Sequence, residues 1–85
     1  MTVVVDTYRR TKDLWEDEVL IVRLGDFFEA FDEDARILAE VCSLPLASLN
    51  GVPMSGFPYW KLKYYGALLL EAGHKIAVAE RMDDE

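Results

Sequence analysis

The segment from Val19 to Phe31 constrains the fold more than any other part of this sequence. The six residues Val19 to Leu24 are almost all β-branched or aliphatic, which is typical of a buried strand. The dipeptide Gly25-Asp26 follows, and a Gly in the first position of a two-residue connection is a hairpin signal. The aromatic run from Phe27 to Phe31 then predicts a second strand that pairs with the first.

The rest of the chain alternates between helical and strand patterns. Asn50-Gly51 is a second hairpin signal, and Cys42 falls on an apolar helix face, where we expect a buried, unreactive thiol. The order of elements predicts an α/β (α+β) fold with one mixed sheet and about three helices, without the Gly-rich loop of doubly wound nucleotide-binding folds. The predicted helices are Thr7–Glu18, Glu33–Cys42 and Pro58–Ala72, and the predicted strands are Val19–Leu24, Phe27–Phe31, Leu44–Leu49, Val52–Met54 and Lys75–Ala79.

Length and composition indicate one domain. The 85 residues suffice for one modest core, and a hydrophobic fraction of 52% is too high for a disordered chain. We therefore expect a single module over residues 1–85, with residues 1–6 as a candidate disordered leader. No apolar run approaches the roughly 20 residues of a membrane span, the start lacks signal-peptide features, and one cysteine forms no internal disulfide. These features predict a cytoplasmic protein without a membrane partner.

The charge and the reactive residues restrict the function. A net charge of −7 opposes binding to phosphates through the global field, so a nucleic-acid function needs a local site. His74 is the single histidine, and no nucleophile accompanies it as in a catalytic triad. The acidic residues between Asp26 and Asp34 match no calcium loop. We expect no enzyme activity, no metal and no cofactor.

Two residues of the predicted hairpin suggest a binding function. In a strand, Phe27 and Glu29 project from one face, whereas Phe28 and Ala30 point to the other face, toward the helices. An apolar ring can insert between base steps from the minor groove, and a carboxyl group beside it can hydrogen-bond to a displaced base. The residues alone leave a second interpretation open, in which a partly exposed Phe and a solvated Glu simply lie on an edge hairpin.

Three aromatic residues at helical spacing offer another candidate. Trp60, Tyr64 and Tyr65 could form a base-stacking platform. Aromatic residues at this spacing belong more often to a core, and we expect core positions for them.

Two sequence motifs resemble a known family. The segment from Val19 to Ala35 contains Gly-Asp-Phe-Phe-Glu between an apolar strand and an acidic helix start. The segment Val52-Pro-Met-Ser-Gly-Phe-Pro-Tyr59 follows at a compatible spacing. Together they resemble the N-terminal mismatch-recognition domain (domain I) of the MutS DNA mismatch repair family. The similarity extends from about Tyr8 to Asp83, which is nearly the whole chain.

The resemblance implies a DNA-binding module for mismatched duplex DNA. It implies that Phe27 stacks on the mismatched base and that Glu29 hydrogen-bonds to it. ATP would be bound only by other domains of the family, which are absent from this chain, so none is expected here. Further domains or a protein partner would complete the assembly.

The basic residues distinguish two functions. Candidate phosphate contacts would form a strip beside Phe27 if they cluster in space; they are Arg9, Lys12, Arg23 and Lys61, together with Arg10 and Lys63. If they scatter, the alternative gains support: a protein-interaction or regulatory domain that kept the fold and lost DNA affinity, with an acidic surface and a hairpin edge for a partner.

Overall fold

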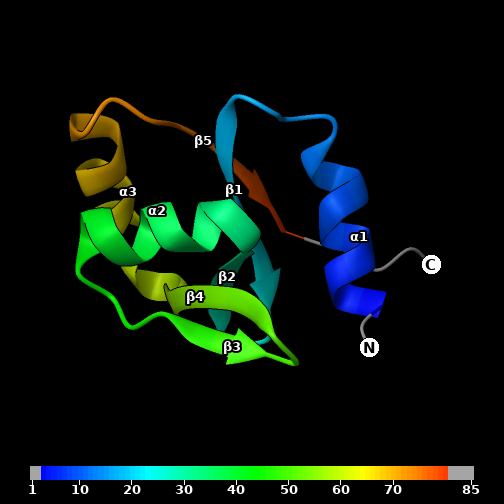
Figure 1. The fold of residues 1–85 in the computed structure, drawn as a ribbon. Coiled ribbons are helices and arrows are strands. Elements are labelled where there is room, and N and C mark those ends of the chain that lie inside the picture. Colours follow the sequence, from blue (N-terminus) through cyan, green and yellow to red (C-terminus); the bar gives the residue numbers. More distant parts are fainter. Residues whose placement is uncertain (1–2, 81–85) are drawn as a thin grey trace.

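The computed structural model describes residues 3–80 and shows one α+β domain (Figure 1). It confirms the predicted fold class, with three α-helices and a five-stranded mixed sheet in this range. No helix in the described part is long and apolar enough to cross a membrane. In chain order, the elements are α1 (Val3–Lys12), β1 (Glu18–Leu24), β2 (Phe27–Phe31), α2 (Asp32–Cys42), β3 (Ala47–Leu49), β4 (Val52–Pro58), the 3₁₀ helix η1 (Tyr59–Lys61), α3 (Leu62–Glu71) and β5 (Lys75–Ala79).

The sheet has the strand order β3-β4-β2-β1-β5. β2 lies in its centre and pairs antiparallel with both β1 and β4, while β5 pairs parallel with β1 and forms one edge. The register places Glu29 opposite Val22 on one side and Gly56 on the other. The residues of β2 are therefore fixed from both sides.

Both predicted hairpins are present. Gly25 has φ +62°, so a Gly leads the two-residue turn between β1 and β2, and Leu24 pairs directly with Phe27. Asn50 and Gly51 have φ +50° and +84°, which matches a turn with two left-handed residues between β3 and β4. These turns fix the register within two pairs of strands, β1 with β2 and β3 with β4.

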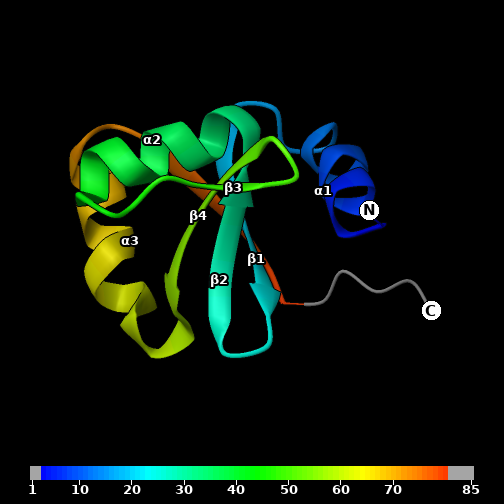
Figure 2. The ribbon, with the colours of Figure 1, turned by 60° about the horizontal axis from the view of Figure 1, so that its bottom comes forward.

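Each face of the sheet carries its own hydrophobic cluster. Helices α2 and α3 cover one face, where Phe28, Phe57 and Leu69 are buried together with Cys42, as predicted for this thiol. Helix α1 covers part of the opposite face. Figure 2 shows this helix near the end of β1 and β2 that is remote from their turn. The residues of this second cluster are Val5, Tyr8, Leu20, Val22 and Phe31.

Helix α1 is anchored by a buried polar network. The hydroxyl of Tyr8 donates its proton to the carbonyl oxygen of Leu20 at 2.6 Å and lies 3.2 Å from Oδ2 of Asp34. The Asp34 carboxylate also accepts from the backbone N–H of Leu20 at 2.9 Å and pairs with Lys12 at 2.9 Å. The network gives Oδ2 of the buried Asp34 carboxylate three partners, which offset the cost of burying its charge.

The predicted boundaries of this helix were wrong. Residues 3–6, predicted as part of a disordered leader, form its first turn because Val5 packs into the same cluster as Tyr8, one turn later. Residues 1 and 2 lie outside the described part. The helix ends at Lys12 instead of Glu18, and tight turns follow in which Trp15 donates to the carbonyl of Lys12.

Two other predictions need correction near β4. This strand continues to Pro58, which has φ −59° and ψ 139° and so is extended instead of being the first helical residue. Trp60 and Tyr64 are 64% and 62% exposed, and only Tyr65 packs against the core. The expected core positions were wrong for the first two rings, because the helix turns that side toward solvent.

Candidate nucleic-acid interface

The five residues of β2 divide between the two faces of the sheet. Phe28 and Ala30 are buried against α2 and α3, as the alternation predicts. Phe27 is 43% exposed and Glu29 is half-buried on the opposite face. Phe31 shares that face but is buried beneath α1, where its ring meets that of Tyr8 edge-on at 5.1 Å. Helix α1 thus covers one end of this face and leaves Phe27 and Glu29 beyond it.

Phe27 lies next to the turn between β1 and β2. It pairs with Leu24 on one side and with Pro58 on the other, so its backbone is held by both neighbours. The N–H of Tyr59 also donates to the carbonyl of Asp26 at 2.8 Å, which ties the turn to the end of β4. The ring therefore projects from a rigid frame, although much of its surface faces solvent.

Glu29 carries a carboxylate that lies over a glycine. A Cβ built on Gly56 would come within 3.0 Å of the Glu29 carboxylate and of the carbonyl oxygen of Phe28. No hydrogen bond or ion pair joins this carboxylate to another residue within residues 3–80. Burial raises the pKa of Glu29 above its usual value, because the charged form is partly removed from water. The result is a carboxyl group with free hydrogen-bonding capacity beside an exposed ring.

Two of the three candidate phosphate contacts on α1 have acidic partners, whereas Arg10 donates only to the Thr7 hydroxyl, at 3.2 Å. Arg9 forms a bidentate pair with Asp32, with both N–O distances 2.8 Å. Asp32 has a left-handed backbone (φ +56°) at the junction of β2 and α2, and the guanidinium lowers the pKa of its carboxyl group. Lys12 pairs with Asp34 and donates to the carbonyl oxygen of Glu18. These cations stabilise the junction between α1 and α2.

The other candidates lie toward the turn. Arg23 stacks over the Tyr59 ring at 3.7 Å, donates to the carbonyl of Gly25 at 2.6 Å and lies 3.7 Å from Glu80. Lys61 is exposed in η1, which starts two residues earlier at Tyr59. The structure therefore brings Arg23 and Lys61 to the same end as Phe27 but does not form one basic strip with the cations of α1.

Asp32 and Asp34 belong to the acidic run that could in principle have bound a divalent cation. Both are occupied by the ion pairs with α1. In residues 3–80, no group of three His, Cys, Asp or Glu side chains is arranged to hold a metal ion.

Sequence reasoning missed two residues that shape the site. Gly56 allows the close approach of Glu29, and a Gly inside a strand pattern was the available signal. Tyr59 holds Arg23 against the turn, and no local pattern marks a cation–π pair between residues 36 positions apart.

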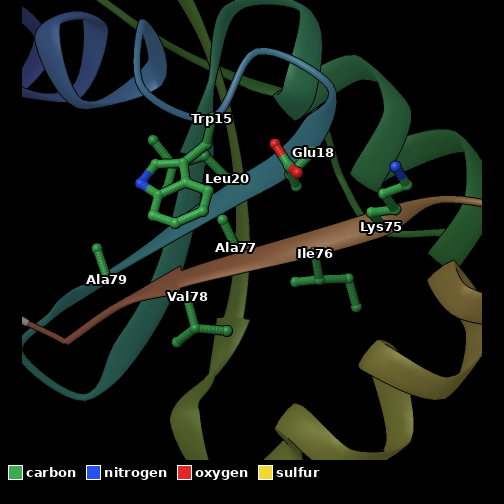
Figure 3. A pocket seen from close by; sticks show the side chains of 8 residues that line it. All are labelled: Trp15, Glu18, Leu20, Lys75, Ile76, Ala77, Val78 and Ala79. Carbon is green, nitrogen blue, oxygen red and sulfur yellow. The ribbon is translucent and has the colours of Figure 1, made fainter.

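An apolar hollow lies at the β5 edge, where the ring of Trp15 projects beside the strand (Figure 3). Leu20, Ala77 and Ala79 form its apolar floor, and Glu18 and Lys75 lie at one end. Because β5 is the last strand of the sheet, one side of its backbone is available for a further strand.

The structure is a small α+β domain with an exposed ring and a half-buried carboxyl group on one face of its central strand. The chain matches the family model of MutS domain I over residues 2–85, and it belongs to this family. It is 42% identical over 84 residues to the DNA mismatch repair protein MutS of Petrotoga mobilis, covering 99% of this chain and 10% of that protein. It is 40% identical to the DNA mismatch repair protein MutS of Thermotoga petrophila, covering 99% and 11%. The chain spans about a tenth of the length of these relatives.

Proposed function

We propose that this domain binds duplex DNA through Phe27 and Glu29 and that the pair probes base pairs for mismatches. The observation that carries the proposal is the position of an exposed ring and an unpartnered carboxyl group on one uncovered face. A ring that enters a base step unstacks it, and a mismatched or unpaired base is the cheapest to displace. The relatives are named as DNA mismatch repair proteins, which agrees with this function.

The state of Glu29 supports a role in reading the displaced base. An ionised carboxylate only accepts hydrogen bonds, whereas a protonated one also donates. Because burial raises the pKa of Glu29, the protonated form is easier to reach than for a solvated glutamate. The side chain can therefore match either an acceptor or a donor on a base edge.

We propose that the domain acts by binding alone. ATP hydrolysis would then belong to parts of the MutS relatives that this chain does not match. The isolated domain should bind weakly, because phosphate contacts dominate DNA affinity and the net charge is −7. A ring stacked on a base contributes about 1–3 kcal/mol to the binding free energy. Unstacking the base step costs a few kcal/mol, so little net affinity remains without phosphate contacts.

Fluorescence anisotropy with the 85-residue chain tests this function. A labelled matched duplex and the same duplex with one G·T pair are titrated at two salt concentrations. We expect weak binding that decreases with salt, favours the G·T duplex and is lost in Phe27→Ala. Glu29→Ala should mainly reduce the preference, and Leu14→Ala, which removes another exposed side chain, is the control. Tight binding that ignores the mismatch and survives Phe27→Ala would refute the proposal.

A second candidate is a protein-interaction domain without DNA affinity. It is favoured by the internal partners of Arg9, Lys12 and Arg23, which reduce the cations available to phosphates. The β5 edge with its apolar hollow would then receive an extended segment of the partner (Figure 3). Absence of DNA binding at any salt concentration, with a protein partner recovered by pull-down and lost on Ala77→Pro, would favour this candidate.

A further inference from the structure

We propose that the surface formed by Trp60, Lys61, Lys63 and Tyr64, here called the Trp60–Tyr64 surface, binds single-stranded DNA. These four residues line one shallow hollow where η1 passes into α3. None of them belongs to the Phe27–Glu29 pair, so the inference goes beyond the proposed function and does not rest on it.

The two rings of this surface are available for stacking. Trp60 and Tyr64 are 64% and 62% exposed, among the most exposed large side chains of the described residues. They lie on either side of the junction between η1 and α3, and both rings line the same shallow hollow. Each ring meets a less exposed neighbour nearly edge-on: Trp60 meets Tyr59 at 5.3 Å and 82°, and Tyr64 meets Tyr65 at 5.0 Å and 79°.

These neighbours are themselves fixed. The guanidinium of Arg23 covers Tyr59 at 3.7 Å, and the Tyr65 ring packs on the buried Phe57 at 4.8 Å. The exposed rings are therefore held by a supporting layer of aromatic side chains. Such rings lose little conformational freedom when a ligand binds, which favours affinity.

The charge of the surface is opposite to that of the chain as a whole. Lys61 and Lys63 are exposed, and no ion pair engages either of them within residues 3–80. By contrast, Arg9, Lys12 and Arg23 all have acidic partners there. Two lysines at the start of a helix oppose its dipole, and the first turn of α3 contains no acidic residue. Helix stability does not account for these lysines, whereas an anionic ligand would compensate their charge.

Single-stranded DNA fits this combination of groups. Its unpaired bases offer flat faces to aromatic rings, while its phosphates pair with ammonium groups. In a duplex, the base faces are already stacked, so rings on an open surface cannot reach them without opening a step. An acidic or aliphatic protein segment would leave either the lysines or the stacking rings unused.

The experiment uses the 85-residue chain and fluorescein-labelled (dT)12 at low salt. Trp15→Phe leaves Trp60 as the single tryptophan of the two in the sequence, so its emission reports on the surface directly. In this background we expect quenching on addition of (dT)12. The double variant Trp60→Ala/Tyr64→Ala should weaken binding by at least about fivefold. Lys61→Gln/Lys63→Gln should reduce the slope of log affinity against log salt by about 1.4.

Phe27→Ala separates this inference from the proposed function. It should leave (dT)12 binding unchanged while it reduces binding to the G·T duplex. Circular dichroism and urea midpoints check that each variant is folded. The inference is overturned if the folded ring variant binds (dT)12 as tightly as the parent, if the salt slope is unchanged, or if Trp60 emission does not respond. It is also overturned if (dT)12 does not bind, whatever the result with the G·T duplex.

Discussion

The carboxylate of Glu29 lies over the Cα of Gly56, at a place where a methyl group would collide with it. The two residues are direct partners in the register of β2 and β4. Because Gly56 of β4 has no side chain, the carboxylate of Glu29 on β2 has room beside it. A Gly inside a strand usually weakens it, but here Gly56 is required for the Glu29 carboxylate to lie where it does.

Gly56→Ala should destabilise the domain by about 1–3 kcal/mol, because the added methyl group forces β4 away from the backbone of Phe28 as well as from Glu29. Gly66→Ala is the matched control. A Cβ there meets its nearest neighbours at 3.7 and 3.8 Å, and helix propensity favours Ala by about 1 kcal/mol. Urea unfolding should show opposite signs for the two variants. Equal effects would contradict the close approach.

Glu29→Gln should stabilise the domain at neutral pH. Burial raises the folded-state pKa of this carboxyl group, so the stability associated with its protonated form is complete below the unfolded pKa of about 4.3 and is lost as pH rises through the folded value. Gln stays neutral throughout. The advantage of the variant should therefore appear above about pH 4, grow through the folded pKa and then level off.

Urea midpoints measured between pH 4 and pH 8 give this profile. Glu16→Gln, which removes one exposed carboxylate from the same acidic chain, controls for the change in net charge. A Glu29→Gln variant that is less stable than the parent at pH 7 would show that the carboxylate makes a favourable interaction in the folded domain.

Leu69→Ala and Phe27→Ala should differ clearly in their effect on stability. Leu69 is fully buried between α3 and the sheet, so its truncation leaves a cavity and costs about 2–5 kcal/mol. Phe27 has no aromatic neighbour in the described part and remains substantially exposed, and its loss should cost less than about 1 kcal/mol. Similar losses in denaturant titrations would mean that the Phe27 ring belongs to the core.

Tyr8→Phe should destabilise the domain by about 1–3 kcal/mol. The substitution keeps the edge contact with Phe31 but removes the hydrogen bonds to the Leu20 carbonyl and to the buried Asp34. Tyr64→Phe removes a hydroxyl from an exposed ring and should change stability by less than about 0.5 kcal/mol. Thermal or urea unfolding of the two variants measures the difference, and a neutral Tyr8→Phe would show that the network adds no net stability.

The central hairpin could be predicted from sequence because its signals are local. Gly25 supplies the turn conformation, and the alternation from Phe27 to Ala30 follows from strand geometry alone. The turn formed by Asn50 and Gly51 is equally local. These signals suffice to predict that Phe27 and Glu29 lie on one face of the sheet.

The covering of the sheet could not be predicted in the same way. The extent of α1 depends on Val5 and Tyr8 finding a surface formed by β1 and β2, which is far away in sequence. The exposure of Trp60 depends on the direction in which α3 leaves β4, and helical spacing does not encode that direction. The internal pairs of Arg9 and Lys12 likewise join residues more than 20 positions apart.

The alternation along β2 has an effect on how this domain can vary. The side chains at positions 28, 30 and 31 are buried in the core, whereas those at positions 27 and 29 are only partly buried. Under the proposed function, folding constrains mainly positions 28, 30 and 31 of this strand, and ligand preference would depend on positions 27 and 29. A change at position 27 would then need no compensating change in the core, whereas a change at position 29 must still fit against Gly56.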